Sequence, residues 1–280
     1  MIRKRQSKVA FQGELGAFSH AAAMKLLGSE IKTLPCASFR EVFEALAGGL
    51  VTHAVIPIEN TLHGSVLENY DNLLEYGYPI QGETSLRIAH QLIAMPGVKL
   101  RDVNRVFSHP VALNQCRLFF QRNTNLRAEP FYDTAGSVKM LMTEHPAGAA
   151  AIASKEAAGI YGGMILKKNI EDDRKNFTRF FLLTKQRPRL STPGMKWKVS
   201  VAFATANTPG SLFRAMACLA LRDINLIKIE SRPIVGTPWE YLFYVDFLGS
   251  LSDERVKSAL ANLREVTQFY KLLGNYAPTP

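Results

Sequence analysis

The sequence has few cysteines and no long apolar run. Cys36, Cys116 and Cys218 are widely separated and form no C-x-x-C pair, which argues against a disulfide framework and for a reducing compartment. No stretch approaches the roughly 18 continuous apolar residues of a membrane span. The basic start MIRKRQSK leads into mixed polar sequence rather than the apolar core of a secretory signal. These absences predict a cytoplasmic protein with no membrane partner.

Acidic residues are outnumbered, since 24 Asp and Glu face 34 Lys and Arg, a net charge of +10. Such an excess suits nucleic acid, a membrane surface or a small anionic ligand. The basic residues are spread thinly, however, and no helix-turn-helix, zinc-finger or RRM-type motif accompanies them. We therefore expect no nucleic-acid partner and interpret the charge as a basic surface that attracts small anions.

Motifs for metals and organic cofactors are also missing. The six histidines show no metal-ligand spacing, and H-E-x-x-H, G-x-S-x-G and the P-loop do not occur. Gly13 and Gly16 in GELGAF form only a fragment of a dinucleotide fingerprint and suit a strand-to-helix turn instead. The sequence predicts no metal and no cofactor.

The 280 residues, 47% of them hydrophobic, are enough for about two domains. Over roughly residues 8–185, strand patterns such as Val9–Gln12 and THAVIPIEN alternate with helical patterns such as SFREVFEALAGGL. This order is typical of an α/β unit with a parallel sheet covered by helices. Ser19 is the expected cap of a helix over Ala21–Leu27.

The segment KNFTRFFLLTK predicts a strand that closes this unit. Alternation along it places Thr178 and Phe180 on one face and Arg179 on the other. Either the strand ends or bulges here, so that all three meet one ligand, or Arg179 has a structural role.

A change of pattern follows residue 185. Residues 186–197 contain two prolines and a glycine among polar residues and predict a linker. Residues 198–280 then read β-α-β-β-α-β, the ferredoxin-like arrangement. In WEYLFYVDF, alternation from Trp239 to Phe247 gives one apolar face, while Leu242 and Tyr244 give another. A strand with two apolar faces needs two covers, and we expect a partner subunit to be the second.

Polar residues gather where predicted strands run into loops. In open α/β sheets, ligands bind at the carboxyl ends of strands and at helix N-termini, so such residues can converge on one cleft. Capping or turn formation would explain each of them alone, but four groups together favour a site. The groups are Glu59, Asn60 and Thr61; Ser108 and His109; Asp133 and Thr134; and Thr178 and Arg179.

These segments resemble a known family. PIENTLHGSV, SHPVALNQC, YDTAGS, AAIASKEAAGIYGG and NFTRF are similar, in this order, to successive blocks of the prephenate dehydratases over about residues 9–184. GSLF and ESRP resemble the two motifs of the regulatory ACT domain of the same enzymes. The resemblance implies a bilobed catalytic domain over 8–185, similar to the lobes of periplasmic binding proteins, followed by a ferredoxin-like ACT domain over 198–280.

The resemblance also implies a reaction. Prephenate would be converted to phenylpyruvate, water and carbon dioxide in phenylalanine biosynthesis, which makes the protein a carbon–oxygen lyase. The forming aromatic ring accepts the electrons of the lost carboxylate, so the chemistry needs no cofactor. Thr178 would hydrogen-bond or protonate the departing hydroxyl in a desolvated cleft. Arg179 offers a planar guanidinium suited to a carboxylate. The implied substrate-binding residues are Glu59, Asn60, Thr61, Ser108, Thr134 and Phe180.

For the C-terminal domain, the resemblance implies L-phenylalanine bound as a feedback inhibitor at an interface between ACT domains of a homodimer or homotetramer. The turn in NTPGSLF would present a helix start to a carboxylate, and Glu230 would meet an ammonium group. Surface charges and a tight turn would explain the same residues without a ligand. The implied effector-binding residues are Gly210, Ser211, Leu212 and Phe213, and Glu230, Ser231, Arg232 and Pro233.

The chain departs from the family pattern at a few positions. Thr61 and Ser211 replace the usual serine and alanine, Phe213 replaces a valine, and Ser137 stands where many relatives carry alanine. Ser137 and Phe213 bear on the choice of substrate and on the seating of phenylalanine. The chain has no room before its first strand for the helical chorismate mutase of fused relatives, which predicts a monofunctional enzyme. Arogenate dehydratase and a non-catalytic metabolite sensor are the alternatives.

Overall fold

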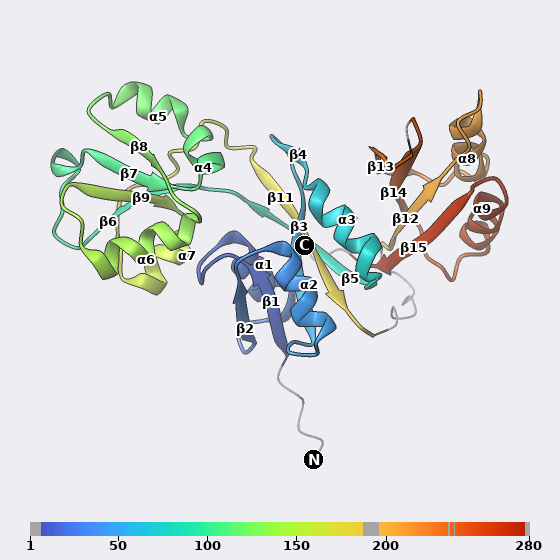
Figure 1. Ribbon diagram of the computed structural model, residues 1–280, viewed down its shortest axis with the longest axis horizontal. Coiled ribbons are helices and arrows are strands. Elements are labelled where there is room, and N and C mark those ends of the chain that lie inside the picture. Colours follow the sequence, from blue (N-terminus) through green and yellow to red (C-terminus); the bar gives the residue numbers. More distant parts are fainter. Residues whose placement is uncertain (1–6, 187–195, 235, 238, 278–280) are drawn as a thin grey trace, which may run out of the picture. The chain divides into compact units, whose positions relative to one another are not determined.

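The computed structural model describes residues 7–186, 196–234, 236–237 and 239–277. The chain forms two compact units (Figure 1). Unit 1 comprises the described residues of 1–70 and 84–180, and unit 2 comprises those of 71–83 and 181–280. This division differs from the predicted one, because residues 71–83 and 181–185 group with the C-terminal part of the chain. The predicted linker over 186–197 lies mostly outside the described residues.

The first lobe of unit 1 is built on a parallel sheet. In it β1 pairs in parallel with both β2 and β3, and β11 lies next to β3. Helices α1 and α2 pack against β1 and β3, where Val42, Phe43 and Leu46 of α2 are fully buried at helical spacing. The elements of this lobe are β1 (Lys8–Gln12), α1 (Phe18–Leu27), β2 (Lys32–Cys36), α2 (Phe39–Ala47), β3 (His53–Asn60) and β4 (Gly64–Ser65). Three further elements, α3 (Leu67–Tyr76), β5 (Ile80–Arg87) and β11 (Phe177–Thr184), each have residues in both units.

The second lobe of unit 1 contains a five-stranded mixed sheet of order β10-β6-β9-β7-β8. Apolar side chains cover both faces of this sheet: Ile152 of β9 packs with α4 and α5, while its neighbours Ala151 and Ala153 pack with α6 and α7. The elements are β6 (Gln91–Ala94), η1 (Leu100–Asp102), β7 (Arg105–Ser108), α4 (Pro110–Asn114), α5 (Arg117–Arg122), β8 (Arg127–Pro130), α6 (Thr134–Glu144), β9 (Ala149–Ala153), α7 (Lys155–Tyr161) and β10 (Met164–Lys167).

The two-lobed α/β architecture predicted for this part of the chain is confirmed, with local corrections. Helix α1 begins at Phe18 after Ala17, so Ser19 lies inside the helix and is not its cap. Strand β2 and helix α3 were not predicted. Pro35 weakens the strand pattern of β2, but its position at the sheet edge tolerates a proline.

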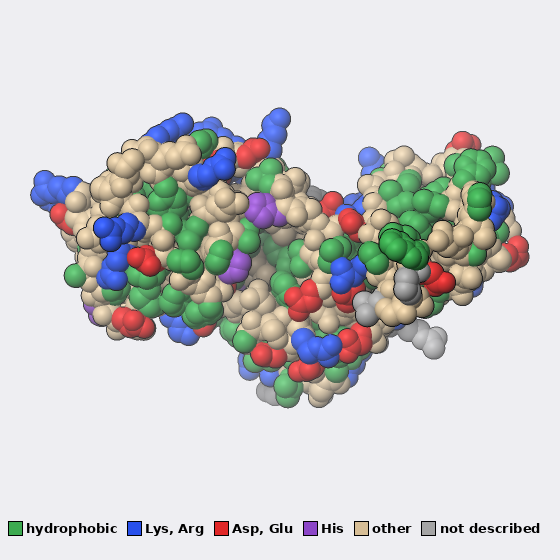
Figure 2. Space-filling view, turned by 45° about the horizontal axis from the view of Figure 1, so that its top comes forward, with side chains coloured by type: hydrophobic (Ala, Val, Ile, Leu, Met, Phe, Trp, Pro, Cys, Tyr) green, Lys and Arg blue, Asp and Glu red, His purple; other side chains and the backbone are tan. Residues whose placement is uncertain are grey.

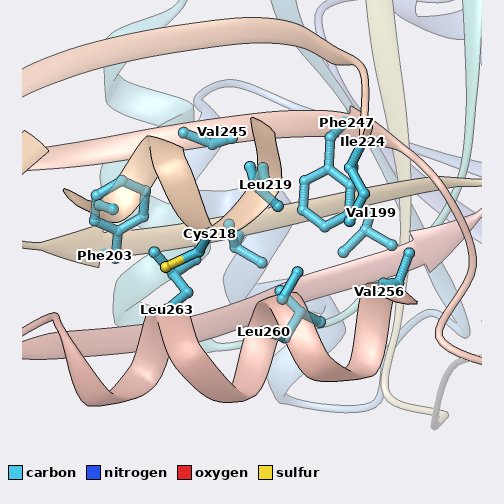
Figure 3. Close-up of a cluster of buried hydrophobic side chains, with 13 residues drawn as sticks. Val199, Phe203, Cys218, Leu219, Ile224, Val245, Phe247, Val256, Leu260 and Leu263 are labelled. Carbon is cyan, nitrogen blue, oxygen red and sulfur yellow. The ribbon is translucent and has the colours of Figure 1, made fainter. Parts of the chain in front are cut away.

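Unit 2 has the predicted ferredoxin-like order, with strands arranged β13-β14-β12-β15 and antiparallel to one another. Figure 3 shows its core, in which Phe203 and Phe247 of the sheet meet Leu219 of α8 and Leu260 of α9. The elements are β12 (Lys198–Ala204), α8 (Ser211–Ala220), β13 (Leu226–Pro233), β14 (Tyr241–Leu248), α9 (Glu254–Glu265) and β15 (Phe269–Tyr276).

The second apolar face of β14 is covered by the chain itself. Leu242 and Tyr244 are buried and line a cavity of about 540 Å³ together with Asp71 and Leu74 of α3. Arg232 of β13 binds both carboxylate oxygens of Asp71. This face therefore does not need the partner subunit that the sequence pattern suggested, because residues 71–76 fold onto it. Trp239 lies before β14 and not on its inner face, and it is 75% exposed.

In the part of the chain that the structure describes, no helix combines the length and the apolar character that crossing a membrane requires.

Candidate active site

A cavity of about 330 Å³ lies in unit 1, lined by residues from both of its lobes. Figure 2 shows histidine side chains beside a hollow in this face of the molecule. Four of the residues predicted to act on or bind the substrate line the cavity, namely Asn60, Thr134, Thr178 and Phe180. The end of β3, the start of α6 and the strand β11 bring them together.

Thr178 and Asn60 are joined by a hydrogen bond at the wall of this cavity. Asn60 Nδ2 donates to Thr178 Oγ1 over 2.9 Å and to Asn176 Oδ1 over 2.7 Å. Asn60 Oδ1 accepts from the backbone N–H groups of Leu62 and His63, which shapes the loop after β3. Because the Thr178 oxygen accepts the amide hydrogen, its own hydroxyl hydrogen is left to donate elsewhere.

Asn176 is part of this network although the sequence analysis did not select it. It is fully buried, and its oxygen accepts a second hydrogen bond from the Asn60 nitrogen that donates to Thr178. Its position within NFTRF, two residues before Thr178, is the signal that could have identified it.

Arg179 lies on the opposite face of β11 from Thr178, as alternation along a regular strand requires. Its guanidinium Nη1 is 3.8 Å from Glu59 Oε2, and neither residue is among those that line the cavity. Thr61 does not line the cavity either, and its hydroxyl donates to Lys175 O and accepts from Phe177 N. These contacts tie the end of β3 and the residue after it to β11 and to Lys175 before β11.

Ser108 is completely buried at the end of β7, and its hydroxyl donates to Ile152 O over 2.6 Å. The next residue, His109, lines the cavity instead. His109 Nδ1 accepts from Val111 N, so it caps α4. Ser137 is likewise buried inside α6, where its hydroxyl donates to Thr134 O.

Two helices begin at the cavity wall. Phe18 and Ser19 in the first turn of α1 line it, as does Thr134, the first residue of α6. Helix N-termini present unpaired N–H groups and a partial positive charge, which suits an anionic ligand. No Lys or Arg is among the described residues that line the cavity. Any attraction of an anion there therefore depends on N–H and O–H donors.

Asp133 places a carboxylate in the same wall. It caps α6 by accepting from Gly136 N over 2.7 Å. Burial raises the pKa of Asp133, although its backbone hydrogen bonds oppose the shift. The carboxyl therefore takes up a proton more readily than an exposed aspartate does.

The two motifs assigned to the C-terminal domain lie in unit 2. Gly210 adopts φ +78° and directly precedes α8, and Phe213 is 76% exposed. At the end of β13, Glu230 is paired with Lys228 and Arg232 with Asp71. Arg232 and Pro233 line the cavity under β14, but none of residues 210–213 is among its described lining. Among the described residues of the whole chain, no group of three potential metal ligands occurs.

The sequence of residues 9–188 matches the family described as prephenate dehydratase. The chain belongs to the prephenate dehydratase family. Membership makes it a lyase that removes water from prephenate in phenylalanine biosynthesis, and the prediction from the sequence motifs is confirmed.

Relatives and solved structures are similar to this protein over nearly the whole chain. Arogenate dehydratase/prephenate dehydratase 2, chloroplastic, of Arabidopsis thaliana is 43% identical over 96% of this chain and 72% of its own length. A prephenate dehydratase of Arthrobacter aurescens, solved in complex with L-Phe, is 32% identical with a TM-score of 0.87, covering 96% and 89% of the two chains. A structure described as GqqA, a novel type of quorum quenching acylase, is 32% identical with a TM-score of 0.89, covering 98% of each chain.

Proposed function

We propose that prephenate is dehydrated in the cavity of unit 1 with Thr178 as the proton donor. The observation that carries this role is the hydrogen bond from Asn60 Nδ2 to Thr178 Oγ1. It leaves the hydroxyl hydrogen of Thr178 as the donor, and it stabilises negative charge that develops on Oγ1 as the proton moves away.

The reaction then balances without a cofactor. The ring C–O bond breaks, and the hydroxyl leaves as water with the proton from Thr178, which is later replaced from solvent. The bond to the ring carboxylate breaks and releases carbon dioxide, and its electron pair completes the aromatic ring. Since a threonine hydroxyl is a weak acid, the step depends on a site that excludes water, and Thr178 is 9% exposed.

Binding of the dianionic substrate follows from the donors around the cavity. The first turns of α1 and α6 face it, and such helix starts stabilise anions by about 0.3 to 1 kcal/mol each at exposed sites. Arg179 pairs with Glu59 of β3 from the opposite face of β11 and acts on the substrate indirectly.

Arogenate is the second candidate substrate. It differs from prephenate by an ammonium group in place of the keto oxygen, and the relatives from Arabidopsis thaliana and Petunia hybrida carry arogenate dehydratase in their names. The same Thr178 chemistry would serve both substrates. An acylase activity like that named for the GqqA structure has less support here, because among the described residues Thr178 Oγ1 is bonded to an amide and not to a base.

We further propose that unit 2 is an ACT regulatory domain whose effector is L-phenylalanine. The L-Phe in the Arthrobacter aurescens relative and the ferredoxin-like order of unit 2 support this. Assembly as a homodimer or homotetramer through unit 2 and a cytoplasmic location belong to the same proposal. The Arabidopsis relative is named chloroplastic, so the compartment differs among relatives.

The deciding experiment measures phenylpyruvate release from prephenate, and phenylalanine release from arogenate, by the unsubstituted protein and by Thr178→Ala. Loss of general acid help lowers a rate by roughly 10² to 10⁴. We expect a fall in kcat of that size for Thr178→Ala and a much smaller one for Thr178→Ser, which keeps the hydroxyl. Addition of L-phenylalanine should suppress turnover by the unsubstituted protein.

The other outcomes are equally informative. If only arogenate is turned over, then arogenate and not prephenate is the substrate, and the proposed role of Thr178 as proton donor still stands. Turnover of neither substrate by folded protein would contradict the proposed function, and equal activity of Thr178→Ala would contradict the role of the hydroxyl.

A further inference from the structure

A buried histidine lies in the cavity wall without a role in the mechanism above. His90, between β5 and β6, is 1% exposed and lines the cavity together with Gln115. Its Nε2 is 2.7 Å from Gln115 Oε1, and no described residue hydrogen-bonds its Nδ1. A buried polar side chain with only one partner costs free energy, so its presence in a ligand cavity needs an explanation.

The surroundings fix the position of His90. Its backbone N–H donates to Glu171 Oε2 over 2.9 Å, and its carbonyl accepts from Ile170 N over 3.0 Å. Glu171 in turn pairs with Arg87. The edge-to-face contact with Phe18, 5.8 Å between ring centroids, holds the imidazole plane. These contacts hold the imidazole ring in one orientation, with Nε2 toward Gln115.

The hydrogen-bond pattern fixes the proton on Nε2. Burial lowers the pKa of His90, so the ring is neutral near pH 7 and carries one proton for its two nitrogens. A proton on Nδ1 would bury a donor without a partner and would set the Nε2 lone pair against Gln115 Oε1. With the proton on Nε2, the ring donates to Gln115.

Gln115 then has only its amide nitrogen left for a ligand. Its oxygen accepts from His90, and its backbone is held at both ends, because its N–H donates to Val111 O and its carbonyl accepts from Asp172 N. An amide whose oxygen is fixed presents its two N–H donors on the other side. Gln115 lines the cavity, so a ligand oxygen can meet these donors.

We propose that His90 is a positioning residue that holds Gln115 as an N–H donor toward a carboxylate or keto oxygen of the substrate. The inference rests on the proposed function, because it requires an oxygen-rich anion in the cavity. It adds a donor where no Lys or Arg lines the wall. It also explains why a neutral, immobile imidazole serves better here than a charged side chain, which could turn toward the anion itself.

The test compares His90→Met with His90→Gln by steady-state kinetics on prephenate. The two side chains are similar in length, but only glutamine keeps an N–H near the position of Nε2. A hydrogen bond to a charged group corresponds to roughly 10- to 100-fold in affinity. We expect His90→Met to raise KM by about that factor while kcat stays within about threefold, and His90→Gln to recover most of the loss.

A double substitution separates positioning from general destabilisation. If His90 acts through Gln115, then His90→Met adds less than about twofold to KM in a Gln115→Met background. Three results would each overturn the inference. The first is a KM increase in the double variant equal to the product of the two single increases, the second is an equal KM for His90→Met and His90→Gln, and the third is a loss confined to kcat. Inactivity of the unsubstituted protein would instead contradict the proposed function on which the inference rests.

Discussion

At the scale of single residues, hydrogen bonds hold the polar side chains of the site in fixed orientations. Asn60 uses both ends of its amide, with Nδ2 toward Thr178 and Oδ1 toward the loop at His63. The chemically active hydroxyl therefore has one direction left in which to donate. Gln115 follows the same rule, since His90 takes its oxygen. Polar groups fixed in this way stabilise developing charge without having to reorient during the reaction.

The carboxyl of Asp133 leads to a prediction about pH. Burial raises its pKa above the ordinary 3.8, so the folded state binds the proton more tightly than the unfolded state. The stability gained from that proton is fully present below pH 3.8 and is lost as the pH rises through the raised pKa. Asn at this position keeps an oxygen for Gly136 N but carries no charge.

We therefore expect Asp133→Asn to gain stability relative to the unsubstituted protein as the pH rises from 3.8 through the raised pKa, and the gain to be constant above it. The gain amounts to about 1.4 kcal/mol for each unit by which the pKa is raised. Thermal unfolding across pH 3.5 to about 8 measures it. Asp253→Asn is the matched control, because hydrogen bonds from Arg255 lower the pKa of this half-buried cap, so its stability should change in the opposite direction. A difference independent of pH for Asp133→Asn would contradict the argument.

At the scale of elements, close contact between a loop and a helix start joins the two lobes of unit 1. Gly16, in the loop between β1 and α1, has φ +89°. Its carbonyl accepts from Ser154, which also caps α7 by accepting from Ala157 N. A Cβ on Gly16 would lie 2.6 Å from Ala157 Cα, closer than real side chains come. Only glycine allows this approach of backbone to backbone.

Gly16→Ala is therefore expected to destabilise the protein by about 2 kcal/mol or more, since the left-handed conformation alone costs roughly 1 to 2 kcal/mol. Gly159→Ala is the matched control on α7 itself, where the position is exposed and an added Cβ meets nothing within 4 Å. That variant should gain roughly 0.5 to 1 kcal/mol from helix propensity. Denaturant unfolding of both variants checks the sign, and equal values for the two would refute the close-contact explanation.

At the scale of the whole molecule, unit 2 presents a strand suited to joining copies of the chain. Among the described strands, β13 lies at one of the two edges of its sheet. Leu226, Ile227 and Ile229 on it are between 37% and 43% exposed. An edge strand with apolar side chains is a template for pairing with another strand, and proteins block such pairing with lysine. The proposed oligomer would therefore be sensitive to charge at this edge.

Ile227→Lys is expected to shift the protein to smaller species in sedimentation velocity, because charge at an edge opposes strand pairing. The concentration of L-phenylalanine needed for half-maximal inhibition should rise at least about tenfold. Prephenate turnover without L-phenylalanine should stay within about twofold, since the cavity of unit 1 contains no residue of β13. Leu221→Lys is the control, because Leu221 is 83% exposed at the end of α8 and lies off the strand. An unchanged assembly and response in Ile227→Lys would exclude this edge as the interface.

The sequence by itself determined the order of the elements and the direction of side chains within them. Alternation along FTRFF placed Thr178 and Phe180 opposite Arg179, and the structure has this arrangement because β11 is a regular strand. The β-α-β-β-α-β order of unit 2 followed from the same periodicities. The helical spacing of Leu67, Tyr70 and Leu73 would also have revealed α3.

The tertiary structure alone decided which partners these side chains have. Asn60 meets Asn176 and Thr178 across more than a hundred residues of chain, and His90 meets Gln115 across 25. Only in the folded chain does the hydroxyl of Ser108 donate to Ile152 O instead of lining the cavity. The packing of α3 residues against the second face of β14 is likewise a property of the tertiary structure. A local pattern records which face a residue occupies but not which distant segment packs there, because that depends on how the sheets and helices fill space together.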